Sequence, residues 1–161
     1  MKNEDYLNIL YSPQWVSKIL HLYISGACSQ NKNGIKNELI YCVLPILTND
    51  DIREKLSHAN NKSSFYTIFE KDMKDRQEFT FNISQHLMSF FQVTNNGLIY
   101  LTNRENITYD IFISTNSPVN TKSKSFENDE EKYFRSAYYL GLIFGKANYI
   151  HIFLKLGISQ L

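Results

Sequence analysis

Apolar residues recur every three or four positions along several stretches of the chain, which is the spacing of one buried helix face. The pattern predicts helices over about 13–27, 35–44, 50–59, 64–70 and 82–94. Ser12-Pro13 starts the first of them, with serine as the cap and proline in the first turn. Thr48 to Asp51 has the spacing of a capping box before the third. These stretches predict a largely helical chain.

After Gly97 the pattern changes to runs rich in β-branched and aromatic residues, over 98–101 and 107–113. The intervening segment 102–106 is polar and suits a turn. The two runs therefore predict a β-hairpin. The segment that follows, about 114–127, is dominated by Ser, Thr, Asn and Lys, and we expect it to be a mobile loop.

The last stretch, 128–157, predicts a long helix, a one-residue break and a shorter helix. Asn128 and Asn148 can cap the two helices, and Gly157 can end the second. Ala137, Gly141 and Gly145 fall four apart and make one smooth stripe. Because a glycine inside a helix costs about 1 kcal/mol relative to alanine, the stripe predicts close approach of another backbone. That backbone belongs either to the chain's own core or to a partner.

The predicted fold class is α+β: mainly α with one β-hairpin, as a single domain over 1–161. The order of three helices and a hairpin between 50 and 113 is that of a winged helix, with further helices at the N- and C-terminal ends. Many small α+β units share this order, so it does not define the fold alone.

Composition narrows the function. Lys and Arg number 17 against 16 Asp and Glu, for a net charge of +1. This balance excludes a protein that coats nucleic acid by charge alone. Cys28 and Cys42 lie in apolar surroundings, which favours two free thiols over a disulfide. No secretory signal is visible, and Lys146, His151 and Lys155 interrupt the most apolar run, so we expect a cytoplasmic protein without a membrane span.

The sequence contains none of the catalytic motifs that we searched for. The chain has no GxxxxGK[ST] loop for nucleotide and no GxSxG nucleophile. The four histidines are dispersed, and none has metal-ligand spacing. The acidic clusters fall at helix starts, where the helix dipole explains them. We therefore predict no enzyme activity, no metal site and no cofactor.

Candidate nucleic-acid contacts are Gln85 and His86 on the helix before the hairpin, Arg104 at its turn, and Lys122 and Lys124 in the loop. A winged helix would place that helix in the major groove. However, the helix has no Arg or Lys between Asn82 and Asn95, and these residues are equally suited to an ordinary polar surface. A stand-alone winged-helix DNA-binding regulator is thus an alternative function.

Five short sequence motifs occur in a fixed order along the chain. They are Ser12-Pro13-Gln14-Trp15, Leu44 to Leu56, Ser64 to Phe69, Asn82 to Leu87 followed by Gly97-Leu98-Ile99, and Tyr139-Leu140-Gly141 with Phe144, Lys146-Ala147 and Leu156-Gly157-Ile158. Together they resemble the small middle component of bacterial three-component ABC-ATPase systems, the group that includes Lamassu-type anti-phage defence. Ile143-Phe144-Gly145 stands where that group has an aromatic pair, which leaves the subfamily open.

The resemblance implies a non-catalytic adaptor subunit in a prokaryotic anti-phage or anti-plasmid complex. It would link an SMC/Rad50-like ABC ATPase to an effector, often a nuclease, and would meet DNA through the complex. An adaptor needs apolar side chains that stay exposed in the monomer. The candidates are aromatic residues of the C-terminal helices, which are equally good core residues: Tyr138, Tyr139, Phe144, Tyr149 and Phe153.

Overall fold

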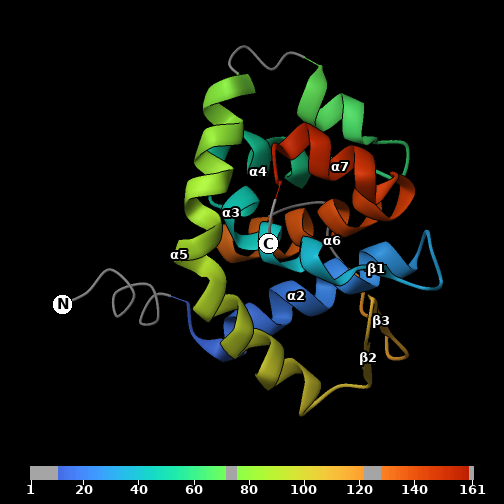
Figure 1. Cartoon of the computed structure of the whole chain (residues 1–161). Helices are drawn as coiled ribbons and strands as arrows, with labels where there is room; N and C mark the ends of the chain where they lie inside the picture. Colours follow the sequence, from blue (N-terminus) through green and yellow to red (C-terminus); the bar gives the residue numbers. More distant parts are fainter. Residues whose placement is uncertain (1–10, 72–75, 122–127, 160–161) are drawn as a thin grey trace.

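The computed structural model describes residues 11–71, 76–121 and 128–159. Most of these residues are helical, and three short strands form one small sheet (Figure 1). The elements are α2 (Pro13–Cys28), β1 (Ile35–Lys36), the 3-10 helix η1 (Asn37–Cys42), α3 (Val43–Leu47), α4 (Asp50–Ser57), the π-helix η2 (Tyr66–Glu70), α5 (Arg76–Thr102), β2 (Ile107–Tyr109), β3 (Phe112–Thr115), α6 (Asp129–Lys146) and α7 (Tyr149–Leu156). The predicted α+β class, mainly helical, is confirmed.

Helix α2 lies at the centre of the fold. From Val16 to Ala27 every residue except Lys18 is buried. Burial on all sides requires other elements around the whole helix, and α5, α6 and the sheet provide them (Figure 1). The helix begins as predicted: the Ser12 side chain accepts a hydrogen bond from the Trp15 amide, and Pro13 occupies the first turn.

Glycines let α6 approach α2 backbone to backbone. A Cβ atom on Gly141 would lie 1.8 Å from the Tyr23 carbonyl oxygen, and one on Gly145 would lie 2.7 Å from that of Ala27. Gly26 of α2 leaves space for α6 in the same way, because a Cβ there would lie 2.0 Å from the Tyr138 carbonyl oxygen. The stripe on α6 therefore packs against the chain's own core, the first of the two interpretations above.

The C-terminal helices follow the predicted pattern. Asn128 accepts a hydrogen bond from the Glu131 amide, and Asn148 accepts one from the Ile150 amide. The break between α6 and α7 has two residues, Ala147 and Asn148, and not the one that was predicted. Gly157 ends α7 with a φ of 67°, a left-handed conformation that glycine adopts without strain.

Helix α5 runs from Arg76 to Thr102, so the predicted start at 82, the predicted end at 95–97 and the predicted strand at 98–101 are all wrong. Gly97 is a packing position inside the helix, because a Cβ there would lie 2.3 Å from Val16 Cγ1. Leu98 and Leu101 are buried one helical turn apart with Val93 and Phe90, which continues the apolar face of α5 against α2. Tertiary packing here outweighs the strand propensity of the local sequence.

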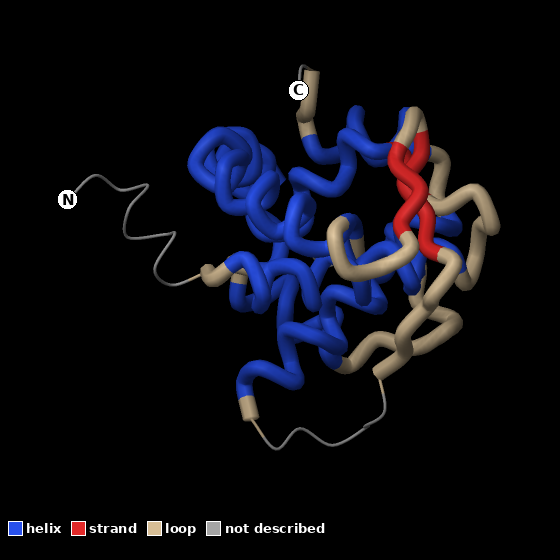
Figure 2. Tube along the Cα trace, turned by 90° about the horizontal axis from the view of Figure 1, so that it is seen from below, coloured by secondary structure: helices blue, strands red, loops and turns tan. Residues whose placement is uncertain are grey.

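The hairpin is formed by β2 and β3 instead, in the antiparallel register Thr108 to Ser114. Strand β1 pairs with the other side of β3 through Ile35 and Ile113, so the sheet has the order β1-β3-β2. Figure 2 shows the strands gathered at one side of the helices. Ser114 and Thr115, expected in the loop, belong to β3, and 116–121 continue beyond it. Residues 122–127 lie outside the described residues, and the mobility of the loop stays a prediction.

The predicted helix over 35–44 is also corrected. Ile35 and Lys36 are extended because they pair with β3, and the chain then forms η1 and α3. Pro45 lies within the first turn of α3, where its missing N–H leaves no helical hydrogen bond unmade. The next helix, α4, is capped by Asn49, whose side chain accepts from the Ile52 amide. Thr48, the predicted cap, donates its hydroxyl to the Pro45 carbonyl instead.

Candidate interaction surfaces

Phe144, one of the predicted interface residues, lies in the core. Its side chain is 0% exposed. The ring meets Tyr23 edge-on at 6.2 Å between centroids and lies 6.0 Å from Phe65 and 5.9 Å from Phe69. This is an aromatic cluster at the contact of α6 with α2 and η2. Phe144 is therefore not part of the surface that we consider below.

Tyr138 and Tyr139 are half-buried on α6, with their rings edge-on at 5.5 Å. The Arg135 guanidinium lies 4.6 Å from the centre of the Tyr139 ring. Arg135 also donates to the carbonyl oxygens of Ser57 at 2.7 Å and Ala59 at 2.9 Å. The arginine thereby ties α6 to the end of α4, so this part of α6 is engaged within the chain.

Tyr149 and Phe153 lie one turn apart on α7, with ring centroids 6.4 Å apart. The fold brings Phe112 of β3 to the Tyr149 ring at the same distance, edge-on. Lys36 lies 5.8 Å from the centres of both the Phe112 and Tyr149 rings, within the range of a cation–π contact. This association across α7, β3 and β1 was not visible in the sequence.

A second aromatic group lies near the same tip of the hairpin, between η1 and α5. The Tyr41 and Phe91 rings stack at 4.8 Å, and the Tyr41 hydroxyl donates to Asn95 Oδ1 at 2.8 Å. Burial, together with the neighbouring Tyr109 hydroxyl, raises the pKa of Tyr41 to about 12. Tyr109 itself is half-exposed, and Ile111 at the hairpin tip is 58% exposed.

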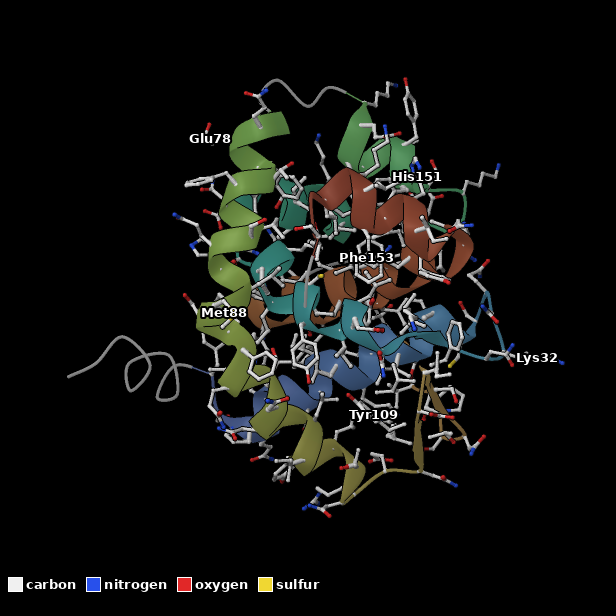
Figure 3. The ribbon with its side chains drawn as sticks, in the orientation of Figure 1. Lys32, Glu78, Met88, Tyr109, His151 and Phe153 are labelled. Carbon is white, nitrogen blue, oxygen red and sulfur yellow. The ribbon has the colours of Figure 1, made fainter. Side chains whose placement is uncertain are left out.

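These groups together form what we call the aromatic surface. Its members share partial exposure and an aromatic or branched apolar side chain, and they come from α5, the hairpin and α7 (Figure 3). The members are Phe91, Tyr109, Ile111, Phe112, Tyr149 and Phe153. Of the five predicted interface residues, Tyr149 is exposed, and Phe153 beside it is half-buried, as Tyr138 and Tyr139 are.

A further apolar surface lies along α5. Phe81, Met88 and Ile99 are 60%, 79% and 60% exposed, and positions 81, 88 and 99 fall within about 20° of one another on a helix of 3.6 residues per turn. Gln85 and Gln92 lie between them and are exposed. We call these residues the outer face of α5. Figure 3 shows Met88 at the edge of the molecule.

The outer face of α5 carries no charge. From Phe79 to Asn103 the sequence contains no Asp, Glu, Lys or Arg. A solvent-facing helix ordinarily has charged residues opposite its buried face. Near the start of the helix, Phe81 and Leu154 of α7 line an open groove of about 590 Å³. This uncharged stretch was the sequence signal for the surface, and its strand-like end at 98–101 concealed that it is one helix.

The predicted nucleic-acid residues are separated in the structure. Arg104 is exposed just after α5, with its guanidinium 5.3 Å from the centre of the Tyr100 ring. Gln85 and His86 are exposed on α5 well before that end. Lys122 and Lys124 lie outside the described residues.

The described residues show no arrangement suited to metal chemistry. Within 11–71, 76–121 and 128–159, no group of three His, Cys, Asp or Glu side chains is placed to hold a metal ion. Cys28 and Cys42 are free thiols. No helix in this part of the chain has the length and apolar character that a membrane span needs.

Comparison with known proteins places the chain at the level of a family. No curated protein and no solved structure matches it. A family model described as "ABC-three component (ABC-3C) system Middle Component 3" matches residues 2–160. The match covers nearly the whole sequence and agrees with the resemblance carried by its five segments. The chain belongs to this family of ABC-three component system middle components.

Proposed function

We propose that this chain is a non-catalytic, cytoplasmic adaptor that links an SMC/Rad50-like ABC ATPase to an effector, a nuclease, in a prokaryotic complex that defends against phage or plasmids. The family supports a middle component of a three-component system. ATP hydrolysis and cleavage of DNA would belong to the partners.

The outer face of α5 is the observation that carries this proposal. Its three large apolar side chains are exposed, and roughly 27 Å separates Phe81 from Ile99 at 1.5 Å per helical residue. The centres of protein interfaces are depleted in charged residues and enriched in aromatic residues and methionine. An uncharged helix face with Phe and Met therefore suits a permanent protein partner better than it suits water.

An adaptor needs two binding surfaces, and the fold offers two, which adjoin on α5, where Phe91 lies three residues after Met88. Met88 marks the outer face of α5 at one edge of the view in Figure 3, whereas Tyr109 and Phe153 of the aromatic surface lie away from it. We assign the outer face of α5 to the ATPase, because a long helix face suits the helical arms of an SMC-like protein. We assign the aromatic surface to the effector.

Co-expression of the full chain with the products of its neighbouring genes tests the proposal. We expect a tagged chain to retain both partners through size-exclusion chromatography. The double variant Phe81→Glu/Met88→Glu should lose the ATPase and keep the effector, and Tyr149→Glu should do the reverse. Lys32→Glu, in an exposed loop, is the control for added negative charge. A monomeric chain that retains neither neighbour would refute the adaptor.

A winged-helix DNA-binding regulator is the second candidate. One observation favours it: β1 follows the first helix and joins the hairpin as a third strand, in the order β1-β3-β2. Against it, the helix before the hairpin has no cationic residue from 79 to 103 to meet DNA. Sequence-specific binding of a DNA duplex by the isolated chain, lost in Gln85→Ala, would place this function first.

A further inference from the structure

A small pocket with both polar and apolar lining residues lies between α2 and the end of α5, beside the start of the hairpin. Its volume is about 170 Å³. Ser17 and His21 line it from α2 and are themselves 6% and 7% exposed, so they form a buried polar floor. Lys18 of α2 and Arg104 after α5 line it as well and are exposed, so they form a cationic rim.

The floor is held rigidly by hydrogen bonds within the chain. His21 Nε2 lies 2.8 Å from the Ser117 carbonyl oxygen, and since a carbonyl can only accept, Nε2 donates. The Ser17 hydroxyl donates to the Gln14 carbonyl at 2.8 Å. These bonds attach the segment after β3 to α2 and fix the shape of the pocket.

The pocket has a positive balance. Lys18 belongs to α2 and Arg104 to the turn after α5, and neither makes an ion pair among the residues that the structure describes. Glu105 is the one carboxylate in the lining, and its Oε2 accepts a hydrogen bond from the Ser117 hydroxyl at 3.3 Å. The lining thus contains two cations and one anion, and that anion already has a donor, which leaves a net positive charge for a second anion.

We propose that this pocket binds one phosphate group, and that the phosphate belongs to the backbone of a nucleic acid. Sites for drug-sized ligands have volumes of about 300–1,000 Å³, so a pocket of 170 Å³ suits a single small group and not a whole nucleotide. Arg104 offers its guanidinium fork, and Lys18 adds a point charge. Because both cations are at the exposed rim, the phosphate of a long polymer can reach them.

Such a contact positions the chain on nucleic acid and does not read its sequence. A net charge of +1 over the whole chain means that no general electrostatic attraction adds to it. The contact is therefore local and weak in the isolated chain, and it gains strength when partners in a complex bind the same duplex. The proposal does not depend on the adaptor function.

Fluorescence anisotropy of a labelled duplex with the full chain at low salt tests the pocket. We expect the logarithm of the affinity to fall with the logarithm of salt concentration with a slope of about −1, since one phosphate is neutralised. Lys18→Gln and Arg104→Gln should each weaken binding at least about fivefold and make the slope shallower. Lys32→Gln removes the same charge from a distant exposed loop and should bind like the original chain.

The outcomes separate the sources of the phosphate. Duplex binding that is lost in the Lys18 and Arg104 variants but kept in Lys32→Gln supports the proposal. Equal binding by all variants, or an equal loss in all three, overturns it. In an NMR titration, amide shifts at Ser17 and Lys18 with inorganic phosphate but none with duplex would overturn the nucleic-acid source. Retention of both partners by Arg104→Gln shows that this result is separate from the adaptor function.

Discussion

The Tyr23 carbonyl oxygen lies where a side chain on Gly141 would begin, 1.8 Å from an ideally placed Cβ. The nearest atoms are backbone, so they cannot turn aside as the end of a side chain can. The contact fixes α6 against α2 at the centre of the molecule. A glycine-to-alanine substitution at this position therefore tests how closely α2 and α6 pack.

Gly141→Ala should lower the free energy of unfolding by about 3 kcal/mol, the upper range for overpacking a core. Helix propensity alone predicts the opposite sign, a gain of about 1 kcal/mol for alanine. Gly145→Ala should cost less, because its Cβ would lie 2.7 Å from the Ala27 carbonyl oxygen. Urea unfolding followed by circular dichroism measures both. A more stable Gly141→Ala chain would contradict the close approach of the two helices.

Phe144 and Tyr149, both candidate interface residues, should differ in their effect on stability. Phe144→Ala removes a side chain that is 0% exposed and should cost about 3–5 kcal/mol of unfolding free energy. Tyr149→Ala, at a position 38% exposed, should cost within about 1 kcal/mol. The same urea series compares them. Similar losses in the two variants would mean that Tyr149 belongs to the core.

Arg135→Met should destabilise the chain by about 2 kcal/mol, because the Ser57 and Ala59 carbonyls lose a charged donor. Arg135→Lys keeps the charge but cannot donate in the same planar fork, so it should recover only part of the loss. Thermal unfolding with a calorimeter gives the two values. Full recovery by lysine would show that charge, and not the shape of the guanidinium, holds α4 to α6.

Cys42 should be unreactive in the folded protein. Burial raises the pKa of its thiol from 9.0 to about 12, so almost no thiolate is present at neutral pH. We expect an aromatic disulfide reagent at pH 8 to modify Cys28, which is half-buried, and to reach Cys42 only after unfolding. In Cys28→Ala the fast reaction should disappear. A fast reaction that persists in that variant would contradict the burial of Cys42.

The same thiol gives a pH dependence with a definite sign. An unfolded chain loses the Cys42 proton near pH 9, whereas the folded chain keeps it until about pH 12. Stability is therefore fully present below pH 9 and falls as pH rises toward 12. Urea unfolding between pH 8 and 10 measures the fall, which should be smaller in Cys42→Ala. An unfolding free energy that rises with pH over this range would contradict the assignment.

Local signals in the sequence predicted local structure well. The caps at Ser12, Asn128 and Asn148 and the glycine end at Gly157 depend on a few adjacent residues, and the structure confirms each. The end of α5 depended on distant contacts instead. Leu98 and Leu101 are helical because α2 lies beside them, and only the fold shows that neighbour.

The candidate site was predictable only in part, for the same reason. Phe144 and Tyr149 have similar surroundings in the sequence, and burial in three dimensions separates them. Phe112 contacts Tyr149, and Lys18 lines the same pocket as Arg104, but the two residues of each pair are far apart along the chain. The absence of charged residues from 79 to 103 is visible in the sequence. Its link to a binding surface depends on the structure, which shows that this stretch is one helix with an exposed face.

The contact between Gly141 and Tyr23 also bears on how the protein is made. The two residues are separated by more than a hundred positions, so during synthesis α2 leaves the ribosome long before α6 exists. Until α6 emerges, the side of α2 that it covers in the folded chain stays exposed, and exposed apolar surface of this kind favours aggregation. The contact between α2 and α6 can therefore form only after α6 has been synthesised.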